Sequence, residues 1–167
     1  MAKQTKQTKQ AGGPYLAAAF FCEKVIEDKQ DSALSAIRII DQVKIVLPSE
    51  TDPDFPSDQD KVPVTVLAVL AFKTGDAAGH HAIRAELVSP SGKKNQPFER
   101  TMPFSVEAHG GANLRLNLTI MVVKGGLFWL DVYLDGKRVT RMPIDISVTR
   151  EPPLQNQLAE PTAATQA

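Results

Sequence analysis

Two alternating runs of residues in the C-terminal half constrain the fold most strongly. Between residues 112 and 122, leucine, isoleucine and valine occupy every even position after the first, and the positions between them are mostly polar. In the run from 127 to 134, apolar residues again fill every even position, and Gly125 and Gly126 separate the two runs. A period of two is typical of a strand with one buried face. The pattern predicts two antiparallel strands joined as a hairpin across the glycines.

A second hairpin is predicted by the dipeptide Asp135-Gly136, which tolerates the positive φ angles of a two-residue type I′ turn. The simplest pairing across this turn places Val139 opposite Val132. The apolar residues further along the chain stand at even positions, so in a regular strand they would point to the opposite face from Val139. A slip of one residue in the pairing would turn every side chain to the other face. We therefore expect a β-bulge or a break between Thr140 and Pro143.

The rest of the chain adds several runs of strand length. They lie at residues 15–22, 33–47, 62–72, 81–87 and 101–107. The run at 62–72 is apolar on both parities, as expected for a central strand covered on both faces. Residues 33–47 also suit one face of a helix, and we favour a strand because of the neighbouring runs. Together the runs predict an all-β fold, a single antiparallel two-sheet β-sandwich of immunoglobulin-like architecture.

The two ends differ in composition from the middle. Residues 1–13 form a basic segment almost without apolar residues, and residues 151–167 are rich in Pro, Gln, Ala and Thr. We expect both to be disordered tails that flank a sandwich domain at residues 14–150. The lysines followed by the apolar run to Cys22 superficially match an export signal, but Glu23 and Lys24 follow at once. We favour a first strand, with a cytoplasmic location and Cys22 as a buried thiol.

Three stretches of the chain carry a resemblance to a known family. They read YLAAAFFCEKVIEDKQDSALSAIRIIDQV from Tyr15, VTVLAVLAFKTGDAAGHHAIRAELVSPSGK from Val64, and GGLFWLDVYLDGKRVTRMPIDI from Gly125. On these stretches the chain resembles a bacterial family of small proteins classed as a domain of unknown function. The resemblance implies a small cytosolic immunoglobulin-like β-sandwich. It implies no activity and supplies no catalytic residues.

Several classes of function are disfavoured by composition and by the motifs that are missing. The 19 basic and 19 acidic residues give a formal net charge of zero, so the chain has no overall basic character for binding nucleic acid or an anionic membrane. It contains no P-loop, no dinucleotide-binding glycine motif and no G-x-S-x-G element. We therefore expect a protein that is not an enzyme and that has no cofactor, nucleic acid or membrane partner.

One cluster of acidic residues is a candidate metal site, and a pair of adjacent histidines is not. Residues 50–60 read ETDPDFPSDQD, and the clustered oxygens of Asp52, Asp54, Asp58 and Asp60 are of the kind that Ca²⁺ binds, although the order of an EF-hand loop is absent. A solvated acidic linker is the alternative. The adjacent His80 and His81 point to opposite faces of a strand, so they do not hold one ion together.

A candidate interaction face follows from the predicted hairpin across Gly125 and Gly126. If Met121 pairs with Leu127, one outward face carries Trp129, Tyr133, Arg115 and Met121. Aromatic residues, Met and Arg are enriched at protein interfaces, and Arg over Tyr can form a cation–π contact. The alternative is that Trp129 belongs to the core.

These expectations favour one function over another. The sequence predicts a non-enzymatic protein-interaction or scaffold module that binds a protein partner or self-associates. The alternative is a β-sandwich that binds a ligand or calcium through the acidic loop at residues 50–60.

Overall fold

The structure, a computed structural model, describes residues 12–31, 33–105 and 111–152. Within these residues the chain forms nine strands and no helix. They are β1 (Tyr15–Glu27), β2 (Leu34–Ile40), β3 (Gln42–Leu47), β4 (Val62–Lys73), β5 (Gly79–Val88), β6 (Phe98–Phe104), β7 (Gly111–Val122), β8 (Gly126–Leu134) and β9 (Lys137–Arg150). The tails expected at 1–13 and 151–167 lie largely outside the described residues. Among the described residues, no helix is long and apolar enough to cross a membrane.

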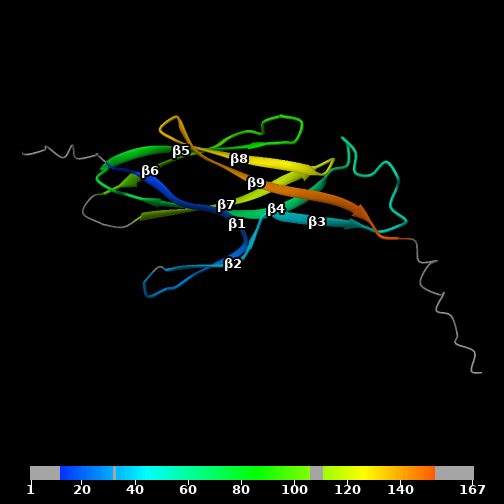
Figure 1. Cartoon of the computed structure of the whole chain (residues 1–167), viewed down its shortest axis with the longest axis horizontal. Helices are drawn as coiled ribbons and strands as arrows, with labels where there is room; N and C mark the ends of the chain where they lie inside the picture. The colour runs from blue at the N-terminus through cyan, green and yellow to red at the C-terminus, as the bar shows by residue number, and fades with distance from the viewer. Residues whose placement is uncertain (1–11, 32, 106–110, 153–167) are drawn as a thin grey trace, which may run out of the picture.

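The strands form two sheets that pack face to face (Figure 1). Sheet A has the order β2-β1-β4-β7, and sheet B has the order β3-β9-β8-β5-β6. All strand pairs are antiparallel except β3 and β9, which run parallel. Sequential strands β4 and β5, and again β7 and β8, lie in different sheets, as in an immunoglobulin-like sandwich. The predicted fold class is confirmed.

The predicted hairpin across Gly125 and Gly126 is wrong. Strand β7 pairs with β4 in sheet A, whereas β8 pairs with β5 and β9 in sheet B, so the connection crosses from one sheet to the other. Alternation shows which face of a strand is buried, and it does not show which strand lies beside it. The glycines allow a close approach, because a Cβ on Gly125 would lie 2.7 Å from the carbonyl oxygen of Ile146.

The hairpin at Asp135-Gly136 is confirmed. Leu134 pairs with Lys137, and the two turn residues have φ angles of 49° and 78°, as a type I′ turn requires. The register of this pairing shifts between Val132 and Tyr133 of β8. Their partners on β9 are Thr140 and Arg138, so β9 has one extra residue between them. The expected bulge therefore falls one residue earlier than predicted, and it resolves the conflict of parity.

Two further predictions are settled by strand pairing. Strand β4 lies between β1 and β7, so the predicted central position is confirmed, but its outer face is only partly covered, because Pro63 and Thr65 are exposed. The ambiguous residues 33–47 form strands rather than a helix, with β2 in sheet A and β3 in sheet B. Asp41 lies between them, and its carbonyl oxygen accepts a hydrogen bond from the backbone N–H of Asp145 (2.9 Å). The chain thus changes sheets at this residue.

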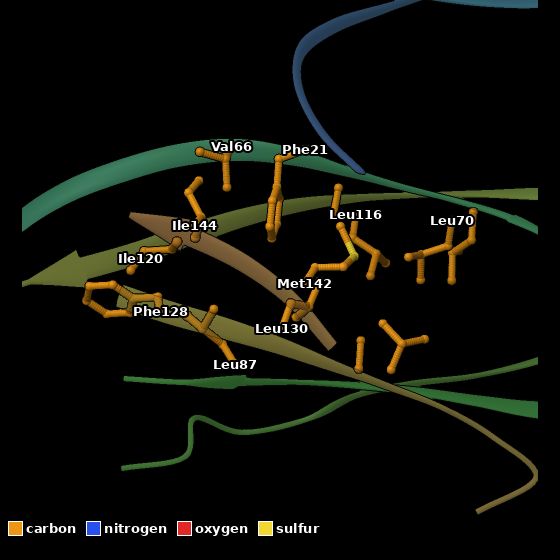
Figure 2. Packing of buried hydrophobic residues seen from close by; sticks show 14 of the residues in the cluster. Phe21, Val66, Leu70, Leu87, Leu116, Ile120, Phe128, Leu130, Met142 and Ile144 are labelled. Atoms are coloured by element: carbon orange, nitrogen blue, oxygen red, sulfur yellow. The ribbon is translucent and has the colours of Figure 1, made fainter. Parts of the chain in front are cut away.

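The core lies between the inner faces of the two sheets (Figure 2). Phe21, Leu70 and Leu116 come from sheet A and pack with Leu130 and Ile144 of sheet B. Each such side chain stabilises the fold by about 1.5–3 kcal/mol relative to an exposed one. Cys22 of β1 is also buried, and its burial raises the pKa of the thiol, so its thiolate is disfavoured at neutral pH.

Candidate interaction face

The structure separates the predicted interaction residues into two pairs. Trp129 and Tyr133 lie on the outer face of sheet B, because the even residues of β8 are buried in the core. Arg115 and Met121 lie on the outer face of sheet A, where Arg115 forms an ion pair with Glu27 (3.0 Å) and Met121 is 50% exposed. The single face predicted from the sequence is therefore wrong, since it depended on pairing β7 with β8.

Trp129 and Tyr133 do not belong to the core, and an arginine lies over each ring. The guanidinium carbon of Arg84 is 5.3 Å from the centroid of the Tyr133 ring, and that of Arg141 is 5.3 Å from the Trp129 ring. The strand register explains both contacts. Arg84 on β5 is directly opposite Tyr133. Arg141 on β9 is directly opposite Asp131, which makes Arg141 a diagonal neighbour of Trp129. Both distances are within the range of cation–π interactions.

Two buried carboxylates lie on the same outer face. Glu86 on β5 and Asp131 on β8 are directly opposite each other, and their side chains are 6% and 2% exposed. Like charges in directly opposite positions destabilise a sheet, and buried charges are costly when unpaired. This arrangement therefore requires cations close to both carboxylates.

Four cationic side chains meet that requirement. Arg141 donates two hydrogen bonds to Asp131, from Nε to Oδ1 (2.6 Å) and from Nη2 to Oδ2 (2.8 Å), and Nη1 of Arg138 lies 3.7 Å from Oδ1. Glu86 accepts hydrogen bonds from Nζ of Lys94 (2.9 Å) and Nη2 of Arg84 (3.0 Å). These are charge-assisted hydrogen bonds, and the one between Arg141 and Asp131 is bidentate.

The cations shift the acid–base equilibria of both carboxylates. The hydrogen bonds from Arg141 hold the pKa of Asp131 below its usual value, against the opposing effect of burial. The hydrogen bond from Lys94, with its charge and that of Arg84, likewise lowers the pKa of Glu86. Both groups are therefore ionised at neutral pH.

We refer to this surface as the aromatic–arginine face. It consists of Trp129, Tyr133, Arg84, Arg138, Arg141, Lys94, Glu86 and Asp131. Its four cations outnumber its two carboxylates by two, and Glu99 on the edge strand, 3.6 Å from Arg84, offsets one of these two charges. The four cationic side chains are 41–58% exposed, whereas Glu86 and Asp131 are nearly inaccessible, so the accessible part of the face is aromatic and cationic.

One signal in the sequence pointed to the residues that were missed. Asp131 is a charged residue within an otherwise apolar and aromatic run, which by itself indicates a need for a buried cationic partner. The identity of that partner depends on strand order. Arg84, Lys94 and Arg141 become neighbours of β8 only because β5 and β9 flank it in sheet B.

The four candidate aspartates lie in the connection between β3 and β4. The backbone oxygens of this loop surround the guanidinium of Arg150, which donates hydrogen bonds to the carbonyls of Thr51 (2.7 Å), Asp52 (2.8 Å), Pro53 (3.0 Å) and Phe55 (2.8 Å). The carboxylate of Asp52 accepts the backbone N–H of Asp54 (2.9 Å). Within the described part of the chain, Asp52, Asp54, Asp58 and Asp60 do not form a group of three or more side chains that could hold a metal ion.

The histidines have separate surroundings. Nδ1 of His81 lies 2.6 Å from Oδ2 of Asp135, and Oδ1 of the same carboxylate accepts the backbone N–H of Ala82 (2.9 Å). The hydrogen bond to His81 lowers the pKa of Asp135. These contacts fasten the β8–β9 turn to β5. His80 is exposed on the opposite side of the strand, as its position next to His81 predicts.

No known protein family has a sequence pattern that matches this chain, and no curated protein matches it. Several solved structures are similar to it at low identity. The alkylpurine DNA glycosylase AlkC of Pseudomonas fluorescens, bound to DNA containing an abasic site analogue, has 7% identity and a TM-score of 0.41 over 77% of this chain. An immunoglobulin-like protein of Pseudomonas aeruginosa has 10% identity and a TM-score of 0.38 over 82% of this chain and 98% of its own. A β-glucosidase of Listeria innocua in complex with glucose has 10% identity and a TM-score of 0.39 over 67% of this chain.

The chain spans 30% of the length of the glycosylase and 15% of the length of the glucosidase. Because no family matches, membership in the bacterial family of unknown function stays a prediction.

Proposed function

We propose that the protein is a non-enzymatic protein-interaction module that binds its partner through the aromatic–arginine face. The observation that carries the proposal is the placement of Arg84 and Arg141 over the rings of Tyr133 and Trp129, on the outer side of sheet B. Trp, Tyr and Arg are the residues most enriched among those that dominate binding energy at interfaces. Here the fold gathers them on the three adjacent strands β5, β8 and β9.

The face is held in place before any partner arrives. The bidentate hydrogen bonds between Arg141 and Asp131 fix the guanidinium above Trp129, and the bond from Arg84 to Glu86 fixes the other above Tyr133. Ordering a flexible side chain on binding costs about 0.5–1.5 kcal/mol. Because the buried carboxylates already order these arginines, a partner avoids part of that cost.

The charge of the face favours an acidic protein as the partner. The cationic side chains of the face are 41–58% exposed, whereas its two buried carboxylates lie on the same outer side but are nearly inaccessible. Complementary charge speeds encounter and excludes partners of the same sign. In a twofold self-association each face meets its own copy, so the cations of the two copies would repel each other. We therefore propose a different, acidic protein rather than a second copy of this chain.

We also propose a cytoplasmic location. The support is the single cysteine, Cys22, which the structure holds as a buried free thiol. An unpaired buried thiol is compatible with a reducing compartment.

The proposal is tested by comparing Trp129→Ala with Tyr15→Ala as bait proteins. Tyr15 is also an exposed aromatic residue, and it lies on β1 in the other sheet. We expect the Trp129 variant to lose at least about tenfold in affinity for an acidic partner, since a hot-spot aromatic contributes about 2 kcal/mol or more. The Tyr15 variant keeps its affinity.

Circular dichroism and thermal unfolding provide the control for both variants. If the folded Trp129 variant binds the same proteins as the wild type with the same affinity, the face is not the interaction site. Binding that is lost equally in both variants leads to the same conclusion, because the effect then does not depend on this face.

A further inference from the structure

A cavity of about 480 Å³ opens at one end of the sandwich, where β7 leads into β8. Its floor is apolar and consists of the core residues Leu87, Ile120 and Phe128, which come from β5, β7 and β8. Figure 2 shows these three side chains gathered at one end of the space between the sheets. Small-molecule sites typically have volumes of about 300–1,000 Å³ and mostly apolar linings. The cavity has the size and the floor of such a site.

The rim of the cavity is cationic. Lys61, Lys93 and Lys124 line it from three different segments of the chain, and all three are exposed. None of them forms an ion pair with a carboxylate among the described residues, in contrast to the neighbouring Lys94, which is paired with Glu86. Asp58 is the one acidic residue in the lining. Three unpaired ammonium groups around an apolar floor favour a ligand that has one anionic end and one apolar end.

The walls of the cavity are fixed by hydrogen bonds and close contacts. The turn at residues 89–92 is closed by a bond from the backbone N–H of Gly92 to the carbonyl of Ser89 (2.9 Å), and the N–H of Asn95 donates to the carbonyl of Leu87 (2.9 Å). This turn packs against the β7–β8 connection, because a Cβ on Gly126 would lie 3.0 Å from Cγ of Pro90. The cavity is therefore formed before a ligand binds.

We propose that this cavity binds a medium-chain monocarboxylate, with the carboxylate among the three lysines and the alkyl chain on the apolar floor. The depth of the cavity sets the chain length, because Leu87, Ile120 and Phe128 belong to the close-packed core and block further entry. Met121 also lines the cavity and is 50% exposed, and a flexible thioether adapts well to an alkyl chain. The site is distinct from the aromatic–arginine face.

Calorimetric titration with straight-chain carboxylates tests the proposal directly. We expect octanoate to bind and to raise the thermal midpoint. From butyrate to octanoate we expect the affinity to rise by up to about fourfold per added methylene, which is the factor for complete burial of each methylene group. For alkyl chains longer than the cavity, the affinity should rise no further. 1-Octanol is the uncharged control and binds more weakly. Absence of heat and of a thermal shift with octanoate overturns the proposal, and so does equal affinity for octanoate and 1-octanol.

Two triple variants separate specific recognition from general charge attraction. The variant Lys61→Ala, Lys93→Ala, Lys124→Ala removes the rim cations, and the matched control Lys24→Ala, Lys29→Ala, Lys44→Ala removes the same charge from exposed residues elsewhere. We expect octanoate to bind about tenfold more weakly to the first variant, because three exposed charge pairs are lost, and to bind the second variant with unchanged affinity. Equal weakening in both variants overturns the proposal.

Nuclear magnetic resonance locates the ligand without any mutation. We expect octanoate to shift the backbone amide signals of residues 87–95 and 120–128. Shifts that spread over the surface, or that centre on the outer face of sheet B, contradict binding in the cavity. Trp129→Ala should bind octanoate as the wild type does, which separates this site from the interaction face.

Discussion

Removal of Arg141 tests the physical basis of the aromatic–arginine face. In Arg141→Met, Asp131 loses both hydrogen bonds of the bidentate pair but stays buried, with its side chain 2% exposed. Breaking a buried ion pair from one side costs about 3–5 kcal/mol. Because the Arg141 side chain is 41% exposed and Arg138 lies 3.7 Å from the same carboxylate, we expect a smaller loss, about 2–3 kcal/mol. For a domain of this size that lowers the thermal midpoint by roughly 10 °C.

The expected loss depends on pH with a defined sign. In the folded wild type the pKa of Asp131 is lower than in the unfolded chain, so ionised Asp131 stabilises the fold. This stabilisation is fully present above the pKa of the unfolded state and is lost as the pH falls through the pKa of the folded state. In Arg141→Met, burial raises the pKa of Asp131 instead, and the neutral acid forms at higher pH. The difference in stability between variant and wild type should therefore be larger at pH 7 than at pH 4.

Urea unfolding followed by the fluorescence of Trp129, the only tryptophan in the chain, measures these differences. The matched variants are Asp131→Leu and the double variant Asp131→Leu, Arg141→Met. Replacing both partners by apolar groups leaves no buried charge, so the double variant should be more stable than the sum of the single losses by at least about 1.5 kcal/mol. Losses that add to within about 0.5 kcal/mol, or that are the same at both pH values, would refute the reasoning.

Three further changes test other parts of the structure. Ile144→Ala removes a fully buried core side chain and should cost about 2–5 kcal/mol in urea unfolding, whereas a cost below 1 kcal/mol would place this residue outside the core. Gly126→Ala places a Cβ against Pro90 at a backbone φ of 146°, which should lower the free energy of unfolding by about 1–3 kcal/mol. An unchanged free energy of unfolding would show that this contact is absent. Arg150→Ala removes the donor for the carbonyls of residues 51, 52, 53 and 55 and should speed hydrogen exchange in that loop while the core stays protected. Unchanged exchange in the loop would contradict the described contacts.

Sequence patterns predicted the fold better than they predicted the site, for a physical reason. Alternation reports burial of one face, and turn residues report local backbone geometry, so the strands and the Asp135-Gly136 turn could be derived residue by residue. Strand order is set by contacts between distant segments. Arg115 was expected beside Tyr133, but the structure places Arg84 there, because β5 rather than β7 is the neighbour of β8.

The bulge on β9 shows what local patterns do determine. The parity of the apolar residues after the turn required one extra residue, and the structure inserts Val139 between the partners of Val132 and Tyr133. The acidic loop shows what they do not. Its aspartates indicated a cation, and the positive charge that lies among its backbone oxygens is Arg150, a residue about a hundred positions away in the sequence.

Site-specific photocrosslinking in living cells tests the central claim most directly. Pro143 is exposed on the outer face of sheet B opposite Trp129, and Met121 is exposed on sheet A. With a photoreactive amino acid at each position in turn, we predict a discrete adduct with an acidic protein from position 143 and none from position 121. The adduct should disappear when Trp129→Ala is added. An adduct formed only from position 121, or one from position 143 that persists in the Trp129→Ala protein, would contradict the claim that this face binds the partner.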